Sequence, residues 1–386
     1  MNKRTKMMLF ALIKSAICGN QLSDKEKEMY SAEMLPQMMK IAKHHDVIHL
    51  LTLGLKKNNL LDGDGQELEK AVFLANYRYE QMNFELVKLC ESLEKAQTPF
   101  ILLKGSVIRE YYPEPWMRTS CDIDVLVHED DLQKATDYLI NNLGYKFNHK
   151  FTHDVSLFTK SGYHIELHYS LMEDEPIKSS AAVLNDVWDF VSKCNGYECR
   201  YELPDAVFYF YHIAHMAKHF ENGGCGIRPF IDLWILENIQ EGNKEKRDEL
   251  LHQGDLLEFT EAARKLSRIW FGNEGYDSVT EQMEDYILRG GVYGNNENRI
   301  IVQQQKSGGR FKYLLSKFFL PYEMLKFYYP ILEKHRWLTP IMQVRRWCRL
   351  ILGGQLMRTT KELHYNSNIT NTEAEKMQNF LRSIGL

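Results

Sequence analysis

The sequence predicts an α+β fold in which a small mixed β-sheet is embedded in mainly helical regions. Three observations carry this prediction. Apolar residues recur every three or four positions through residues 1–98, which is the period of amphipathic helices. Between residues 99 and 175 the chain changes to short apolar or alternating runs that are typical of strands. From residue 186 to about residue 290 the helical period returns.

The composition is that of an ordinary globular protein. The chain has 386 residues, enough for two or three domains, of which 44% are hydrophobic and 26% charged. A net charge of -4 does not by itself indicate a nucleic-acid partner. The seven cysteines are scattered and form no C-x-x-C pair, which is typical of free thiols in a reducing compartment. We therefore expect a cytoplasmic protein.

The first residues, MNKRTKMMLFALIKSAIC, loosely mimic a secretory signal, with a basic start and a short apolar run. Lys14 interrupts that run, however, and the apolar residues fall at helical spacing. They are Leu9, Leu12, Ile13, Ala16 and Ile17. We expect an ordinary amphipathic helix here, and no stretch of the chain approaches the apolar length that a membrane span needs.

A long amphipathic helix is expected before the strands, and Pro99 ends it. Its apolar positions are Leu68, Val72, Ala75, Tyr79, Met82, Leu86, Leu89 and Leu93. Five strands are expected after it, at PFILL, CDIDVLV, KFNHK, DVSLFTK and YHIELHYSL. Between the second and third strands, EDDLQKATDYLINNLGY reads as a helix with acidic residues in its first turn.

Asp122 and Asp124 alternate with Ile123 and Val125 in the second of these strands. Because residues i and i+2 of a strand point the same way, both carboxylates are expected on one face. Carboxylates this close repel each other unless a cation lies between them, and a hard ion such as Mg²⁺ prefers oxygen ligands. Two solvated aspartates at an exposed strand end would produce the same motif, so the neighbouring motifs have to decide.

Gly105 and Ser106 follow the first strand and open a short helix. A glycine there lets backbone N–H groups approach an anion, and a helix N-terminus favours negative charge. The Ser106 hydroxyl can donate a further hydrogen bond. An ordinary helix start capped by serine has the same sequence, so this motif alone leaves both interpretations open.

The fifth strand supplies a third carboxylate. Glu166 is flanked by Ile165 and Leu167, which alternate to the buried face. His164, Glu166 and His168 therefore share the opposite face. A mid-strand carboxylate that points the same way as two histidines indicates a functional site.

These motifs resemble the polymerase-beta-like nucleotidyltransferase superfamily: Gly-Ser, then two alternating acidic residues on a strand, then a third acidic residue on a later strand. More narrowly, LLKGSVIREYYPEPWMRTSCDIDVLV and HIELHYSL are similar to a large bacterial family of poorly characterised nucleotidyltransferases with a Leu-Lys-Gly motif. The motifs cover residues 99–171, and YHIAHMAKHF and GIRPFIDLWIL extend the similarity over most of the chain. Lys104 stands where many members of the superfamily have an aliphatic residue, and the spacing from Gly105 to Asp122 is longer than in compact antibiotic-modifying relatives.

The resemblance implies catalysis with two Mg²⁺ ions. Asp122 and Asp124 would bridge both ions, one on the triphosphate and one near the attacking hydroxyl. Glu166 would bind the second ion and help to activate the acceptor hydroxyl.

The resemblance also implies a site for the triphosphate. Gly105 and Ser106 would hold the β- and γ-phosphates, and Lys104 and Arg118 are candidates for neutralising the pyrophosphate that leaves. For both cations, an ordinary surface position fits the sequence equally well.

Histidines recur on one face of the helix expected at YHIAHMAKHF: His212, His215 and His219. No cysteine or carboxylate completes a zinc motif there, so we expect a polar face that lines a cleft or packs locally. The resemblance places this helix beside the catalytic unit, which makes His168, His215 and Arg228 candidates for contacts with the acceptor. An internal salt bridge between Arg228 and Asp232 is an equally good interpretation.

Residues 306–361 contain twelve Lys or Arg and two Glu, a local charge of about +10. Aromatic residues are interleaved: Phe311, Tyr313, Phe318, Phe319, Tyr322, Phe327, Tyr328, Tyr329, Trp337 and Trp347. Such a region could bind a phosphate backbone or an anionic membrane surface. We favour an aromatic core with a solvated basic face, because the rest of the chain is acidic enough to pair with it.

Together these features predict a Mg²⁺-dependent nucleotidyltransferase that moves a nucleoside monophosphate from an NTP to a hydroxyl acceptor and releases pyrophosphate. The acceptor, a small molecule, sugar, protein or RNA, is not readable. Alternatives are a non-catalytic module that binds an NTP or a regulatory partner, and an RNA-binding protein that uses the basic region. The expected parts are an N-terminal helical region (1–98), the catalytic core (99–175), a helical domain lining the cleft (176–290) and a basic, aromatic-rich C-terminal helical region (291–386).

Overall fold

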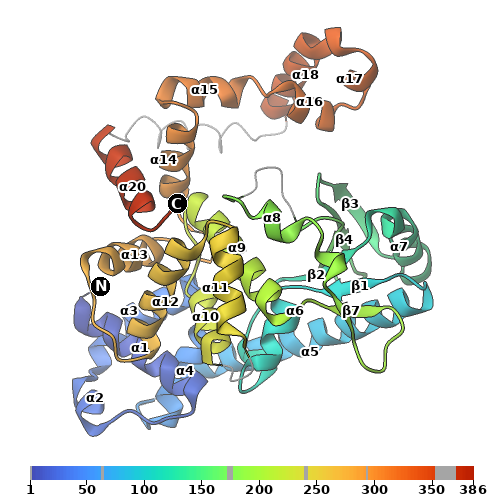
Figure 1. The fold of residues 1–386 in the computed structure, drawn as a ribbon. Helices are drawn as coiled ribbons and strands as arrows, with labels where there is room; N and C mark the ends of the chain where they lie inside the picture. The colour runs from blue at the N-terminus through green and yellow to red at the C-terminus, as the bar shows by residue number, and fades with distance from the viewer. Residues whose placement is uncertain (1, 62–64, 172–176, 239–241, 293, 353–370) are drawn as a thin grey trace. The chain divides into compact units, whose positions relative to one another are not determined.

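The computed structural model describes residues 2–61, 65–171, 177–238, 242–292, 294–352 and 371–386. Within these residues the strands form one mixed sheet in the order β3-β4-β5-β2-β1-β7-β6 (Figure 1). The strands are β1 (Phe100–Leu102), β2 (Asp122–Val127), β3 (Lys146–Lys150), β4 (Asp154–Phe158), β5 (His164–His168), β6 (Ser192–Lys193) and β7 (Arg200–Glu202). β1 to β5 confirm the strands expected between residues 99 and 175, and the combination of a mixed sheet with helices confirms the α+β class.

Two strands lie outside the segment where strands were expected. β7 runs parallel to β1, with Phe100 opposite Arg200 and Ile101 opposite Tyr201, and β6 pairs antiparallel with β7. The expectation that only the helical period follows residue 186 is therefore wrong for residues 192–202. β6 has two residues and β7 three, too few to show a strand period in the sequence.

The pairing places β2 at the centre of the sheet. β1 runs antiparallel to β2 on one side, and β5 runs parallel to it on the other. β4 is antiparallel to β5, and β3 is antiparallel to β4. Strands that are far apart in the sequence are thus direct neighbours, and residues of β2 and β5 face each other.

The helices α5 (Gln66–Lys95) and α7 (Leu132–Tyr138) pack on one face of this sheet. The shared core contains Leu89 and Leu93 of α5, Ile123 and Val125 of β2, and Leu167 of β5, all fully or almost fully buried. α5 confirms the long amphipathic helix expected before Pro99. Because one face of the sheet is occupied by this core, polar residues of the same strands point to the opposite face.

The N-terminal helices are α1 (Lys3–Cys18), α2 (Asp24–Met29), α3 (Leu35–His44) and α4 (Ile48–Lys57). The five apolar residues expected on one face of α1 are all buried, which confirms an amphipathic helix packed on a core. α1 crosses α4 where Gly54 faces the backbone of Leu12. A Cβ on Gly54 would lie 2.1 Å from the Leu12 carbonyl oxygen, so the crossing requires glycine.

The other helices up to residue 289 are α6 (Gly105–Ile108), α8 (Ala181–Leu184), α9 (Asp205–Glu221), α10 (Arg228–Asn238), α11 (Lys244–Gln253), α12 (Leu257–Phe271) and α13 (Ser278–Arg289). α12 contacts α1, α10, α11 and α13. Phe10 of α1 stacks on Trp270 of α12, with ring centroids 4.1 Å apart. The N-terminal helices and the helices that follow the sheet therefore share one core.

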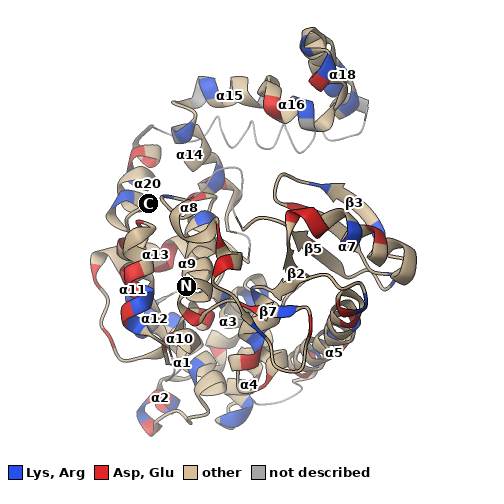
Figure 2. Cartoon of the chain, turned by 45° about the vertical axis from the view of Figure 1, so that its right-hand side comes forward, with Lys and Arg blue, Asp and Glu red and all other residues tan. Residues whose placement is uncertain are grey.

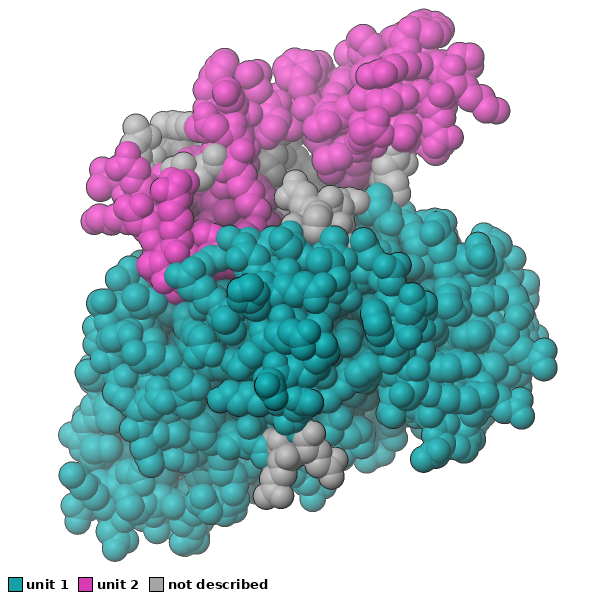
Figure 3. All heavy atoms as spheres, in the orientation of Figure 1, with its two compact units in different colours: residues 1–218, 225–292, 385 teal, residues 219–224, 293–384, 386 magenta. Residues whose placement is uncertain are grey.

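The chain divides into two compact units (Figure 3). The first contains residues 1–218, 225–292 and 385, and the second contains residues 219–224, 293–384 and 386. The second unit contains α14 (Asn296–Lys306), α15 (Arg310–Phe318), α16 (Tyr322–Tyr328), α17 (Ile331–Lys334), α18 (Thr339–Leu352) and α20 (Asn371–Ser383). The sheet and the helices around it lie in the first unit. The four-part division inferred from the sequence stays a prediction.

The basic C-terminal region has only a small core. Leu325, Leu332 and Met342 are buried together, and Tyr322 and Tyr329 pack against them. Other aromatic residues of the region are exposed: Phe311, Phe318, Phe319, Tyr328 and Trp337. For these residues the expectation of an aromatic core is wrong. The side chain of Phe327, and Arg358 and Lys361, lie outside the described part of the chain.

Figure 2 shows basic residues along α15, α16 and α18. The guanidinium of Arg336 stacks over the Tyr322 ring, 4.5 Å from its centroid. The region therefore presents basic and aromatic side chains together rather than on separate faces.

Across the described residues, every helix is too short or too polar to cross a membrane. All seven cysteines carry free thiols, as the sequence predicted.

Replacing Gly54 with Ala tests the α1–α4 crossing. Its methyl group would meet a backbone carbonyl, so the helices must separate, and we expect the free energy of unfolding to fall by about 3 kcal/mol. Urea unfolding followed by circular dichroism measures the change. Gly275→Ala is the matched control, because no atom lies within 4 Å of its Cβ position. Equal stabilities of the two variants would contradict the close crossing.

The buried His45 predicts a pH dependence of stability. Burial, with the nearby His44 and Arg228, lowers its pKa from 6.5 to about 4, and its ring nitrogens have no hydrogen-bond partner among the described residues. Between pH 6.5 and 4, His45 is protonated in the unfolded chain and neutral in the folded protein. The free energy of unfolding therefore falls as the pH drops through this range. The expected loss from this group is up to about 3 kcal/mol. Urea unfolding across this range should show a shallower pH slope for His45→Gln, whereas the exposed His252→Gln should keep the wild-type slope.

Candidate active site

The acidic residues that the sequence singled out lie on one face of the central strands. β2 and β5 are parallel and in register, with Asp122 opposite His164 and Asp124 opposite Glu166. Ile123, between the two aspartates, is fully buried on the opposite face. Since paired residues on neighbouring strands point the same way, the register sets Asp124 and Glu166 side by side. The alternation predicted for both strands is confirmed.

Asp124, Glu166 and His168 form a compact cluster on this face. His168 Nε2 lies 3.0 Å from Asp124 Oδ1 and 3.4 Å from Glu166 Oε2. One ligand atom from each of the three residues lies within 4.8 Å of the others, a spacing that could hold a metal ion. The carboxylate oxygens suit a hard cation such as Mg²⁺, whereas imidazole is more typical of transition metals.

Asp122 extends the acidic face beyond this cluster. Burial and the neighbouring Asp124 carboxylate raise the pKa of Asp122. The two aspartates therefore repel each other when both are ionised, as the sequence predicted, and a cation bound between them would relieve that repulsion.

Lys104 provides a cation at this face. It follows β1 with φ 45° and ψ -121°, and a positive φ at a residue with a side chain costs about 1–3 kcal/mol. Its Nζ donates a hydrogen bond to Asp124 Oδ1 at 2.8 Å and lies 4.0 Å from Glu166 Oε2. Tyr211 of α9 also hydrogen-bonds to Lys104. The sequence pointed to phosphate as the partner of Lys104, and in the structure its ammonium binds the carboxylates.

These neighbours decide the charge of Asp124. Burial alone would raise the pKa of its carboxyl, but Lys104 and His168 outweigh burial and hold that pKa well below its ordinary value. Burial likewise opposes protonation of His168, yet hydrogen bonds to Asp124 and Glu166 raise its pKa. Asp124 is therefore ionised and lies between two proton donors.

Gly105 has a packing reason as well as its place in the motif. A Cβ there would lie 3.0 Å from Arg118 Nη1 and 3.2 Å from Ser120 Oγ. The glycine therefore allows a guanidinium to lie directly against the turn that follows β1.

The Ser106 hydroxyl, in the same turn, makes no hydrogen bond to the described residues. Its Oγ is buried and finds no partner among the described residues, which is rare for a hydroxyl. The N–H groups of Ser106 and Val107 already donate to the carbonyls of Leu103 and Lys104. An anion at this turn would therefore be recognised through the Ser106 hydroxyl more than through these amides.

Arg118 is engaged by a buried anion. Its Nη2 donates to Asp232 Oδ2 at 2.9 Å, its Nε donates to Asp232 Oδ1 at 3.2 Å, and the Tyr112 hydroxyl donates to the same carboxylate at 2.7 Å. Asp232 lies on α10 and is fully buried. The sequence had suggested a salt bridge between Arg228 and Asp232. In the structure Asp232 pairs with Arg118 instead.

Arg228 instead binds the segment before β2. Its Nη1 donates to the Thr119 carbonyl at 2.6 Å and lies 3.4 Å from Asp46 Oδ2. Thr119 Oγ1 donates to the same Asp46 carboxylate at 2.8 Å. Arg228 thus anchors the loop that carries Arg118, and no contact in the described residues sets it beside Glu166.

One face of α9 approaches the carboxylates. Burial raises the pKa of Tyr211 to about 12, with Lys104, Asp124 and Glu166 nearby. Burial and the charge of Lys104 lower the pKa of Lys218 to about 8, and Glu166 opposes this shift. Tyr211 and Lys218 are seven positions apart and share a helix face. The sequence analysis missed both, although their spacing within YHIAHMAKHF was a usable signal.

The histidines of this helix show no zinc cluster in the part of the chain that the structure describes. His212 is buried, and its Nε2 lies 3.2 Å from the Pro229 carbonyl oxygen. His215 lies against Tyr211, with ring centroids 6.4 Å apart. This agrees with the expectation of a locally packed polar face.

β4 adds two polar residues that the sequence analysis also missed. Asp154 lies opposite His168 and Ser156 opposite Glu166, so both share the acidic face. Ser156 Oγ lies 2.7 Å from His164 Nε2, and the other ring nitrogen, His164 Nδ1, lies 3.7 Å from Glu166 Oε1. The alternation in DVSLF was the available signal, but the register that joins it to β5 was not readable.

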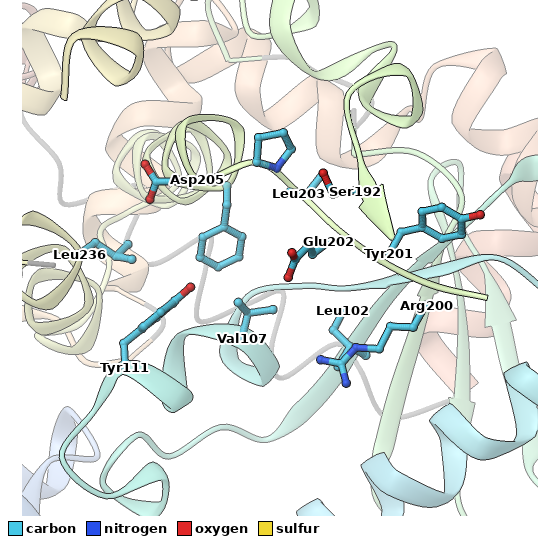
Figure 4. A pocket seen from close by; sticks show the side chains of 12 residues that line it. Leu102, Val107, Tyr111, Ser192, Arg200, Tyr201, Glu202, Leu203, Asp205 and Leu236 are labelled. Atoms are coloured by element: carbon cyan, nitrogen blue, oxygen red, sulfur yellow. The ribbon is translucent and has the colours of Figure 1, made fainter. Parts of the chain in front are cut away.

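A separate pocket of about 260 Å³ lies beside α6 (Figure 4). Leu102, Val107, Glu202 and Asp205 are among the residues that line it. None of the three predicted catalytic carboxylates does, so this pocket is distinct from the acidic face.

A family model described as an uncharacterised nucleotidyltransferase matches residues 32–272 of this chain, well over half of its length. The matched range contains the acidic face, the turn at Lys104 and the Arg118–Asp232 pair. No curated protein and no solved structure matches the chain. The match confirms the resemblance that the motifs indicated.

Replacing Asp232 with Ala tests the buried ion pair. It would leave the Arg118 guanidinium and the Tyr112 hydroxyl buried without their acceptor, so we expect the free energy of unfolding to fall by about 3–5 kcal/mol. Urea unfolding measures it. Glu249→Ala removes an exposed pair with Lys246 as the control and should change stability by less than about 0.5 kcal/mol. If both variants lost the same free energy of unfolding, the buried Asp232 ion pair would stabilise the protein no more than an exposed one.

Proposed function

The chain belongs to the uncharacterised nucleotidyltransferase family, and we propose that it transfers a nucleoside monophosphate from an NTP to a hydroxyl acceptor with release of pyrophosphate. The observation that carries this proposal is the register of β2 and β5. It sets Asp124 beside Glu166 and leaves Asp122 on the same face. The order of these elements matches what the motifs predicted, with Gly105 and Ser106 at the end of a neighbouring strand.

The carboxylates of Asp122, Asp124 and Glu166 would hold Mg²⁺, since their oxygens suit a hard cation. The bound metal would neutralise charge on the phosphates and lower the pKa of the acceptor hydroxyl. Use of two ions, as the resemblance implies, is part of this proposal.

Glu166 is our candidate for the proton acceptor. Its side chain is 26% exposed, whereas that of Asp124 is 3% exposed, so Glu166 is the more accessible to an incoming hydroxyl. In the reaction the acceptor oxygen forms a bond to the α-phosphorus and the bond from that phosphorus to the bridging oxygen breaks. The hydroxyl proton passes to Glu166, and the electron pair leaves with pyrophosphate.

Other residues position this group. His168 is buried and contacts Asp124 and Glu166, so we assign it to orienting the carboxylates rather than to binding the acceptor. The Ser106 hydroxyl is the donor we assign to the triphosphate. Arg118 already binds Asp232 through two hydrogen bonds, so its role is to shape the turn at Gly105.

One observation favours a second candidate, a non-catalytic module that binds a nucleotide or a protein partner. Lys104 and His168 contact the carboxylates of Asp124 and Glu166 and offset part of their negative charge. A site balanced in this way could retain its fold without catalysis. Pyrophosphate release separates the two functions.

Replacing Asp122 and Asp124 together with Asn tests the proposed function. We expect ATP, GTP, CTP or UTP to bind the wild type in the presence of Mg²⁺, and the double variant to bind about 100-fold more weakly or worse, because it lacks two anionic ligands. Isothermal calorimetry with each NTP measures binding, and pyrophosphate release with mixtures of sugars, proteins and RNA measures transfer.

Asp137→Asn is the matched control, since Asp137 is an exposed carboxylate on α7. It should bind and react as the wild type does. If no NTP binds, or if the double variant binds equally well, the proposal is wrong. Binding without pyrophosphate release for any acceptor class would favour the non-catalytic module.

A further inference from the structure

Lys104 occupies an unusual position for a phosphate-binding lysine. Its positive φ of 45°, at the junction between β1 and α6, is one that residues with side chains seldom adopt. From this backbone position the side-chain ammonium reaches the acidic face. Its Nζ lies 2.8 Å from Asp124 Oδ1 and 4.0 Å from Glu166 Oε2. The carboxylates are on adjacent parallel strands, so one cation lies between the two positions where like charge is concentrated.

The hydroxyl of Tyr211 on α9 also lies near this ammonium and interacts with it. Lys104 is 20% exposed and Asp124 3%, so the contact is largely withdrawn from water. Salt screens such a pair little. The Lys104 ammonium therefore shares Asp124 Oδ1 with His168, and a cation of higher charge that approached this oxygen would meet the ammonium.

We propose that Lys104 is a built-in counter-cation, which holds Asp124 and Glu166 together before substrate arrives and which a divalent ion must displace in order to bind Asp124 Oδ1. A divalent ion bound to this oxygen would lie close to the ammonium, and repulsion between the two would weaken its binding. The displaced ammonium is then free to bind the triphosphate. This last step rests on the proposed function, whereas the displacement itself does not.

The test uses the full-length protein and Mn²⁺ without nucleotide. In Lys104→Met no ammonium has to leave, so we expect calorimetry to show Mn²⁺ binding about 10-fold or more tighter than in the wild type. We also expect the variant to have a lower melting temperature in EDTA, because its carboxylates repel each other, and to regain it when Mn²⁺ is added. The wild type should change little between the two conditions.

Two variants serve as controls. Lys56→Met removes an exposed lysine that pairs with Glu69, and it should leave both Mn²⁺ affinity and the response to EDTA unchanged. Lys104→Arg retains a cation and should bind Mn²⁺ no more tightly than the wild type. If Lys104→Met does not fold, Lys104→Gln takes its place as a neutral side chain with a hydrogen-bond donor, and the same increase in affinity is expected.

A measurement on the wild type tests the displacement without any substitution. Reductive methylation read by mass spectrometry should modify Lys104 slowly in EDTA and faster in Mn²⁺, relative to Lys56. Equal rates would overturn the displacement step. Unchanged or weaker Mn²⁺ binding by Lys104→Met, or by Lys104→Gln in its place, would overturn the proposal. A second Mn²⁺ ion bound by Lys104→Met, with wild-type affinity for the first, would also overturn it.

The outcomes also separate this inference from the proposed function. Tighter Mn²⁺ binding by Lys104→Met supports the built-in cation even if no NTP binds the wild type. Conversely, the wild type could bind an NTP in a Mg²⁺-dependent way while Lys104→Met has an unchanged Mn²⁺ affinity. That result would support the proposed function and contradict the role of Lys104 as a counter-cation.

Discussion

The in-register pairing of β2 with β5 brings like charges together, and the rest of the site compensates for that constraint. Asp124 and Glu166 lie opposite each other, and Asp122 is two residues from the first. Their repulsion is balanced by groups from different elements, Lys104 from the turn after β1 and His168 from β5 itself. The strained backbone of Lys104 is tolerated because the turn places its ammonium where the negative charge is concentrated.

The sequence predicted those features that depend on local periodicity. Strict alternation identified β2 and β5 and the face of their acidic residues, because a strand has a fixed period of two. β6 and β7 were missed, since strands of two and three residues show no period. Contacts that depend on tertiary structure were also not readable: Asp232 lies 114 positions from Arg118, and no local pattern connects them. The contact of Lys104 with Asp124 joins residues 20 positions apart and was not readable either.

The C-terminal region shows a different limit. Its aromatic and basic residues were correctly identified as interleaved, but composition does not decide which rings are buried. Leu325 and Leu332 form a core that accommodates Tyr322 and Tyr329. Phe311 and Trp337, each 72% exposed, lie outside it. The second unit therefore exposes rings that an aromatic core would have buried.

The loop between β1 and β2 is anchored by partners that lie far away on both sides in sequence. Thr119 bonds to Asp46, before the sheet begins, and Arg118 bonds to Asp232, well after it ends. The sheet is therefore held in place by residues that lie outside residues 99–175. If residues 99–175 were moved into another chain, the buried guanidinium of Arg118 would lose Asp232, its anionic partner. A transfer that kept both anchors would have to include Asp46 and Asp232 as well as the sheet.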